Sequence, residues 1–225
     1  MVLRDNPFEG LTADSLAPIY EWPEEALRFL AGQADCLHVT GDCGMGKTTL
    51  LQQIEHRIRS QGESVTYTCI PLDGTINLTQ VCPGTVALLD ETDRLSAPTL
   101  RDILTALWDE GHRPVLAGHK KQLREIRRAG FTTLHLPLRA VRSSEALARI
   151  FTRRIDVSSG GPTHPYELTP GATNALLHHS QGNVERCLQI GYEVFEDLDS
   201  PRAISAADIA TAAADLEQAI APAEA

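Results

Sequence analysis

One eight-residue segment limits the possible folds of this chain more than any other feature. Residues 41–48 read Gly-Asp-Cys-Gly-Met-Gly-Lys-Thr and match the pattern GxxxxGK[ST] at every required position. An apolar, strand-like run, 36–40, precedes the segment, and a helical pattern, 47–60, follows it. Glycines in such a turn let backbone N–H groups surround phosphate oxygens, and the start of the helix adds a positive field. The strand–loop–helix context favours a phosphate-binding loop over a glycine-rich turn with accidental spacing.

Two side chains of this loop carry the expected chemistry. The Lys47 ammonium is expected to contact the β- and γ-phosphates of a nucleotide, and the Thr48 hydroxyl is expected to ligate Mg²⁺. The residues of this segment that we expect to contact the nucleotide are Gly41, Asp42, Cys43, Gly44, Met45, Gly46, Lys47, Thr48 and Thr49.

An acidic motif follows the third apolar run. The sequence TVALLD ends at Asp90, and Glu91 comes next, which is the layout of a Walker B motif. Asp90 would hold Mg²⁺ near Thr48, either directly or in the second shell. Glu91 would polarise the attacking water as a general base, which favours hydrolysis over transfer to a small-molecule acceptor. A solvated strand end is the alternative, and the four apolar residues before Asp90 count against it. Because no NKxD motif is visible, we expect ATP rather than GTP.

The order of the elements predicts an α/β fold. Apolar runs alternate with helical patterns, which implies a parallel sheet with right-handed crossovers. The expected strands are 36–40, 64–70, 85–90, 114–118 and 131–138, and the expected helices between and before them are 23–30, 47–60, 98–110 and 120–130. Four further helices follow, at 143–155, 169–181, 183–198 and 205–220, with a linker at 156–168 and a loose tail at 221–225. We therefore expect a P-loop core, 1–140, and a small all-helical C-terminal domain, 141–225.

Charge and composition restrict the partners. The net charge is −10, yet ten of the 20 Lys and Arg residues lie between Lys120 and Arg154. That concentration could face phosphates of DNA, although the acidic total lowers the affinity expected of a monomer. No apolar run reaches the roughly 18–20 residues of a membrane helix. The N-terminus lacks the layout of a signal peptide, so we expect a cytoplasmic protein with no membrane partner.

The cysteines and histidines show no pattern of a metal site. The five cysteines are dispersed and odd in number, so we interpret them as reduced thiols acting as small apolar residues. The eight histidines form no HExxH motif, and the adjacent pair His178 and His179 is expected on a helix surface.

Several segments together resemble the AAA+ superfamily of ATPases. The run DETDRL, 90–95, resembles the acidic motif of origin-recognition-type members. The run PVLAGHKKQL, 114–123, and the opening NPF are similar to a group that includes TniB/TnsC-like transposition regulators and secretion-associated ATPases. The resemblance implies that His119 stands at the sensor-1 position, which reads the γ-phosphate, although Asn, Ser or Thr is more usual there.

The C-terminal part adds to the resemblance. The stretch LTPGATNALLHHSQGNVERCLQI, 168–190, resembles the AAA+ lid, which implies that Arg186 is a sensor-2 arginine; a surface arginine is the alternative. Arg127 and Arg128 occupy the region where AAA+ proteins place an arginine finger that completes a neighbouring subunit's site. Either of the two could serve, and a solvated or DNA-facing helix is the alternative. Altogether the resemblance covers roughly residues 6–215.

One departure bears on the function. Only about fifteen residues separate the second and third strands, and no aromatic residue occurs between Tyr67 and Trp108, so a protein-threading unfoldase is disfavoured. The leading hypothesis is an ATP-hydrolysing assembly switch, a homo-oligomeric ring or filament with nucleotide between subunits, associated with duplex DNA. The second hypothesis is a nucleotide-regulated protein–protein module that does not bind DNA. In both, a separate effector protein is expected. A metabolic P-loop kinase, the third, lacks an evident acceptor pocket and does not explain the lid.

Overall fold

The computed structural model describes residues 6–76 and 85–220, which divide into two compact units. Residues 16–139 form an α/β unit, and residues 6–15 join 140–220 in a helical unit. The α/β unit ends at residue 139, and we expected the P-loop core to span 1–140. The expectation for the N-terminus differs, because residues 6–15 group with the helices rather than with the sheet. The expected tail, 221–225, and part of the segment between the second and third strands, 77–84, lie outside the described residues.

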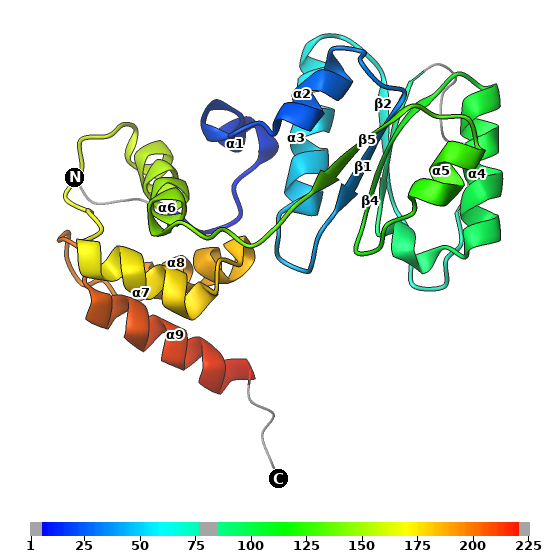
Figure 1. Cartoon of the computed structure of the whole chain (residues 1–225). Helices are drawn as coiled ribbons and strands as arrows, with labels where there is room; N and C mark the ends of the chain where they lie inside the picture. Colours follow the sequence, from blue (N-terminus) through cyan, green and yellow to red (C-terminus); the bar gives the residue numbers. More distant parts are fainter. Residues whose placement is uncertain (1–5, 77–84, 221–225) are drawn as a thin grey trace. The chain divides into compact units, whose positions relative to one another are not determined.

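A five-stranded parallel sheet forms the centre of the α/β unit (Figure 1). Its strands are β1 (Cys36–Thr40), β2 (Val65–Cys69), β3 (Val86–Asp90), β4 (Arg113–Gly118) and β5 (Thr133–Pro137). They are ordered β2-β3-β4-β1-β5, and every pair is parallel. All strands therefore end at one edge, and the loops that follow β1, β3 and β4 leave that edge next to one another. The expected α/β fold with a parallel sheet is confirmed.

Helices cover both faces of this sheet (Figure 1). One face carries α2 (Glu24–Leu30) and α3 (Lys47–Ser60), and the other carries α4 (Ala97–Asp109) and α5 (Leu123–Arg128). Along β3, Val86 and Leu88 pack in the cluster that includes α3, whereas Ala87 and Leu89 pack in the cluster that includes α4. An uninterrupted apolar run is typical of such a strand, which is buried on both faces.

Helix α5 is shorter than the sequence predicts, because the backbone before it is engaged elsewhere. The expected helix covers 120–130, but α5 begins at Leu123. The N–H groups of His119 and Lys120 donate to the Asp93 carboxylate, and the N–H of Gln122 donates to the His38 ring. These contacts hold residues 119–122 in a bent, non-helical conformation, so the helix begins only at Leu123.

Four helices make up most of the helical unit: α6 (Ser144–Ser159), α7 (Pro170–Ser180), α8 (Val184–Glu196) and α9 (Ala206–Ile220). Ser143, Thr169 and Asn183 cap three of them, each accepting a hydrogen bond from the third backbone N–H that follows. Helix α6 runs four residues into the expected linker. Ser159, the last helical residue, is buried and donates to the Ile155 carbonyl. The helix ends at Gly160, whose φ of +74° favours glycine.

The N-terminal segment packs into the helical unit through Phe8. The Phe8 ring lies 4.3 Å from that of Phe151, centroid to centroid, and is 7% exposed. A Cβ at Gly191 of α8 would come within 2.6 Å of the Phe8 ring. Only glycine therefore lets α8 approach so closely, which explains why residues 6–15 belong to this unit. Helix α1 (Ala13–Leu16) and the 3₁₀ turn η1 (Ala17–Ile19) then lead the chain into the α/β unit.

The described cysteines form no disulfide. Cys36 and Cys187 are buried as expected, and burial raises the pKa of Cys187 to about 12. Cys43 and Cys69 are exposed, so these two free thiols do not pack as apolar side chains in the interior, and Cys82 lies outside the described residues. Within residues 6–76 and 85–220, no helix is long and apolar enough to span a membrane.

Candidate functional site

The loop from Gly41 to Thr48 joins β1 to α3. Its backbone adopts positive φ values at two of its glycines. Gly44 and Gly46 have φ values of +76° and +84°, which favour glycine. A Cβ at Gly41 would lie 2.8 Å from the Leu138 carbonyl oxygen, so this position also excludes a side chain. The loop can therefore turn tightly at the sheet edge and direct N–H groups toward a ligand.

Lys47 folds back onto this loop. Its ammonium donates to the carbonyl oxygens of Gly41, at 2.7 Å, and Asp42, at 3.0 Å. The side chain is only 6% exposed, so those two hydrogen bonds stabilise a charge that burial would otherwise disfavour. Lys47 is thus held at the mouth of the loop, where the sequence predicts a phosphate contact.

Thr48 and Asp90 meet although 42 residues separate them. The Thr48 hydroxyl donates to Asp90 Oδ2 at 2.7 Å, and the Asp90 side chain is almost fully buried. Tyr67 of β2 donates to the same oxygen at 3.0 Å. Burial and the neighbouring carboxylate raise the pKa of Tyr67 well above its usual range, so this hydroxyl keeps its proton. The structure therefore joins the two expected metal-site residues and adds a tyrosine.

Glu91 follows in a conformation that is unusual for a residue with a Cβ. Its φ is +60°, and it begins a short 3₁₀ helix, η3 (Thr92–Arg94). Its N–H donates to Asp90 Oδ1 at 2.9 Å, and its carboxylate lies 3.5 Å from the Arg94 guanidinium. Arg94 also donates to the Ile70 carbonyl, just beyond β2. Arg94 thus holds the proposed general base against the end of a neighbouring strand.

His119 reaches the loop from the end of β4. Its Nε2 lies 3.8 Å from the Cys43 sulfur, so two predicted nucleotide-contacting residues are neighbours. Asp93 orders this exit by accepting the backbone N–H groups of His119 and Lys120. A Cβ at Gly118 would lie 2.8 Å from the Asp93 carboxylate, so glycine is required for the close approach.

A hydrogen-bonded cluster joins β1, η3 and the segment before α5. Gln122 and Thr92 exchange hydrogen bonds of 2.8 and 3.0 Å, and the N–H of Gln122 donates to His38 Nε2 at 3.1 Å. His38 is fully buried in β1, stacks at 5.5 Å on His135 of β5 and leaves its Nδ1 without a partner in the described structure. Burial, and secondarily the charge of His135, lower the pKa of His38 to about 4. The imidazole is therefore neutral at physiological pH.

The arginines predicted as finger and sensor form other contacts or none among the described residues. Arg127 and Arg128 are exposed in the last turn of α5, and neither side chain forms a hydrogen bond or ion pair with residues 6–76 or 85–220. Arg186 belongs to the helical unit, where its guanidinium contacts the Ala213 carbonyl at 3.3 Å and the Glu217 carboxylate at 3.4 Å. The roles of all three stay predictions.

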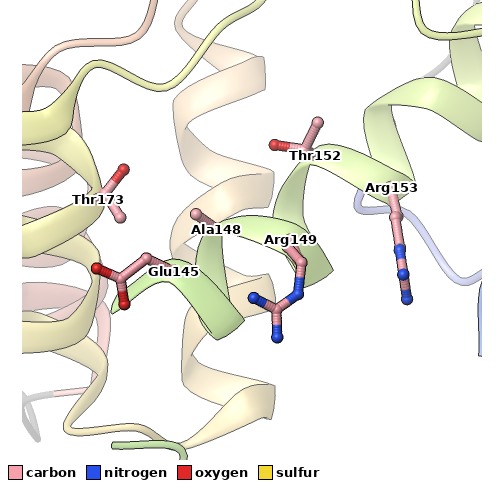
Figure 2. A pocket seen from close by; sticks show the side chains of 6 residues that line it. All are labelled: Glu145, Ala148, Arg149, Thr152, Arg153 and Thr173. Atoms are coloured by element: carbon pink, nitrogen blue, oxygen red, sulfur yellow. The ribbon is translucent and has the colours of Figure 1, made fainter. Parts of the chain in front are cut away.

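A separate open groove of about 330 Å³ lies on the helical unit (Figure 2). Arg149 and Arg153, one turn apart on α6, extend to the same side of the helix (Figure 2). Thr152 of α6 and Thr173 of α7 add hydroxyls to the lining. The one acidic lining residue, Glu145, accepts from the Ser143 hydroxyl at 2.6 Å, which holds the pKa of this carboxyl below its usual value. The groove therefore presents two cations and one anion.

The sequence analysis did not identify three residues that contact the candidate site residues: Tyr67, Asp93 and Arg94. Asp93 and Arg94 stand inside the DETDRL run but received no role of their own. Tyr67 gives a weaker signal, because its contact with Asp90 depends on β2 being the neighbour of β3. No local sequence pattern predicts that β2 and β3 are neighbours in the sheet.

The fold is similar to that of solved AAA+ structures. RuvB from Thermotoga maritima, described as a Holliday junction branch migration motor, matches with a TM-score of 0.63 and 18% identity over 93% of this chain and 73% of that one. A variant of the same protein gives a TM-score of 0.65 and 18% identity over 91% and 68%. NtrX from Brucella abortus in complex with ATP gives 0.56 and 18% over 84% and 56%.

No protein-family model matches the chain. No curated protein matches it either. The structural similarity concerns the fold: the chain has the AAA+ fold, with a five-stranded parallel sheet and a C-terminal helical region, as in RuvB.

Proposed function

We propose that this chain binds ATP together with Mg²⁺ and hydrolyses it. The observation that carries the proposal is the convergence of Lys47, Thr48, Asp90 and Glu91 at one edge of the sheet, supported by the hydrogen bond of 2.7 Å between Thr48 and Asp90. The ATP complex of NtrX, a protein of similar fold, agrees with this choice of nucleotide.

The side chains at the edge suit both ligands. The Lys47 ammonium now contacts two backbone carbonyls, and phosphate oxygens would replace them as stronger, charged acceptors. A hydroxyl next to a carboxylate is a donor set that suits Mg²⁺, because hard cations prefer oxygen ligands. Thr48 would ligate the ion, and Asp90 would hold it either directly or through Thr48; the bound ion would supply charge stabilisation on the phosphates.

Glu91 and His119 would act on the reacting end of the nucleotide. Glu91 would accept a proton from the attacking water, with Arg94 orienting its carboxylate. His119, next to Cys43 of the loop, would contact the terminal phosphate. Arg186 would serve as a sensor from the helical unit, and Arg127 or Arg128 would complete the site of a neighbouring protomer. The active form is then a homo-oligomer, a ring or filament, that assembles with ATP and separates after hydrolysis.

The hydrolysis proposal is tested by ATP turnover as a function of protein concentration. We expect turnover per chain to rise with concentration, because a neighbour must supply the finger. Lys47→Ala should abolish turnover and weaken ATP binding. Arg127→Ala and Arg128→Ala should separate the two candidates, since only the finger variant should be rescued by mixing with Lys47→Ala protein, whose own finger is intact. Wild-type protein that binds no ATP would refute the proposal.

We further propose that the assembled protein associates with duplex DNA, as the resemblance to transposition regulators implies. The two arginines and two threonine hydroxyls of the α6 groove suit the phosphates of a nucleic-acid backbone (Figure 2). RuvB, a protein of similar fold, is described as a Holliday junction motor. The finer assignment to transposition regulators rests on the sequence resemblance alone.

DNA retention separates this hypothesis from its alternative. We expect duplex binding that requires ATP and weakens steeply with salt, and the double variant Arg149→Gln, Arg153→Gln should lower it roughly tenfold and reduce the salt dependence. The matched control, Arg28→Gln with Arg59→Gln, removes two exposed cations from the α/β unit. If DNA never binds while ATP still drives assembly, the alternative holds: a nucleotide-regulated module that controls a partner enzyme through protein contacts.

A further inference from the structure

Three hydrogen bonds converge on the carboxylate of Asp90. Oδ2 accepts from the Thr48 hydroxyl at 2.7 Å and from the Tyr67 hydroxyl at 3.0 Å, and Oδ1 accepts from the Glu91 N–H at 2.9 Å. An ionised carboxylate offers about four acceptor positions, so three are taken. Asp90 is 2% exposed, and water cannot easily replace a lost partner there.

The position of Tyr67 follows from strand pairing. β2 and β3 run parallel, with Tyr67 beside Leu88 and Cys69 beside Asp90. Tyr67 packs with Leu88 in the cluster that includes α3, so both lie on the face to which Asp90, two residues after Leu88, also belongs. The length of a tyrosine side chain matches the rise of about two strand residues, and its hydroxyl therefore ends at Asp90.

We propose that Tyr67 is a positioning residue for the metal side of the nucleotide site. It holds the Asp90 carboxylate so that Oδ2 faces the Thr48 hydroxyl, and it occupies an acceptor position that direct metal ligation by Oδ2 would require. Asp90 then acts on Mg²⁺ mainly through Thr48. This inference rests on the proposed function, and it favours the indirect mode of action for Oδ2, because both acceptor positions of that oxygen are already taken.

The ring and the hydroxyl of Tyr67 contribute separately. The ring packs against apolar side chains of the sheet and α3, and a phenylalanine would keep that packing. Within residues 6–76 and 85–220 the hydroxyl donates to Asp90 alone, so its removal changes the surroundings of that carboxylate and little else. Outer partners of metal ligands typically contribute 10–100-fold to metal affinity.

The test is a titration of Tyr67→Phe with a fluorescent ATP analogue, first in EDTA and then with increasing Mg²⁺. We expect metal-free affinity within about twofold of wild type, because the hydroxyl does not contact the loop, and a Mg²⁺ midpoint raised roughly tenfold. Free Mn²⁺ measured by electron paramagnetic resonance gives the same comparison without turnover. Tyr20→Phe is the matched control, since Tyr20 packs on Trp22 in the same unit.

The outcomes are distinguishable. A raised midpoint in Tyr67→Phe alone, with unchanged thermal unfolding, supports the positioning role. An unchanged midpoint with ATP still bound overturns it and leaves the proposed function standing. A loss of metal-free affinity equal to the loss with Mg²⁺ also overturns it, because the effect would then lie in the loop. Wild-type protein that binds no ATP overturns both proposals.

Discussion

The two units of this chain bury different kinds of side chain. Among the described residues, the α/β unit buries eight polar or charged ones, including Lys47, Asp90 and His38, whereas the helical unit buries only Ser159 and Ser180. A buried charge or imidazole destabilises a fold unless hydrogen bonds compensate it, and the α/β unit provides them around its sheet edge. The α/β unit therefore has the buried polar groups that the proposed nucleotide chemistry needs, whereas the interior of the helical unit is almost entirely apolar among the described residues.

The largest expected effect tests where the chemistry lies. Glu91→Gln should slow ATP turnover by roughly 100-fold or more while ATP still binds, because the neutral amide cannot accept the proton of water. Turnover and equilibrium binding of the nucleotide measure the two steps separately. Glu185→Gln, which removes a carboxylate from the first turn of α8, is the control and should leave turnover unchanged. An equal loss of turnover in Glu91→Gln and Glu185→Gln would contradict the assignment of the chemistry to the α/β unit.

The next effect tests whether the units are stabilised separately. Phe8→Ala should destabilise the helical unit by about 3–5 kcal/mol, because Phe8 fills the space between Phe151 and Gly191. Both tryptophans, Trp22 and Trp108, lie in the α/β unit, so their fluorescence reports on that unit, whereas far-UV circular dichroism also follows the helices.

We therefore expect the dichroism transition in urea to move further than the fluorescence transition. Phe29 is fully buried in the α/β unit, so Phe29→Ala should move the fluorescence transition further than the dichroism transition. Identical shifts by both probes would mean that the units unfold together, and the distinction between them would then apply to chemistry alone.

A third prediction uses pH. The unfolded chain protonates His38 near pH 6.5, but the folded chain does so only near pH 4, so the unfolded state binds more protons between these values. Stability should be complete above about pH 6.5 and fall by up to about 3 kcal/mol as the pH decreases toward 4.

His38→Gln keeps an acceptor for the Gln122 N–H and should flatten this part of the pH profile. His178→Gln, which removes an exposed histidine from the helical unit, should not. Urea unfolding at several pH values measures both. A wild-type profile that is flat between pH 6.5 and 4 would show that the buried imidazole does not distinguish the two units.

The smallest effect concerns Arg186. Arg186 pairs with Glu217, whose side chain is 70% exposed. Glu217→Gln should therefore change the free energy of unfolding by less than about 1 kcal/mol and leave ATP affinity unchanged. Arg186→Gln should weaken ATP binding several-fold if the arginine acts as a sensor. Isothermal titration with ATP compares the ATP affinities of the Glu217→Gln and Arg186→Gln variants. If the two affinities are equal, Arg186 does not act as a sensor and serves only its contacts with Ala213 and Glu217.

Much of the α/β unit could be predicted from local sequence. The helix from Lys47 to Ser60 and the strand from Cys36 to Thr40 have the expected bounds, because glycines and a change of apolar period mark their ends. The predicted ends of α5 and α6 differ from the observed ones, because they depend on tertiary contacts and burial. Asp93 and His38 hold the chain before α5, and the burial of Ser159 extends α6.

The sequence by itself determined the chemistry that this chain can offer. The spacing within 41–48 and the carboxylates after β3 predict a phosphate loop and its acidic partner, because each motif depends on a few neighbouring residues. Tertiary structure alone decided which side chains surround them. Tyr67 reaches Asp90 only because β2 lies beside β3, and Phe8 joins a helix 183 residues away only because Gly191 leaves room for its ring. Such contacts depend on strand order and close packing, which act between segments that no local pattern connects.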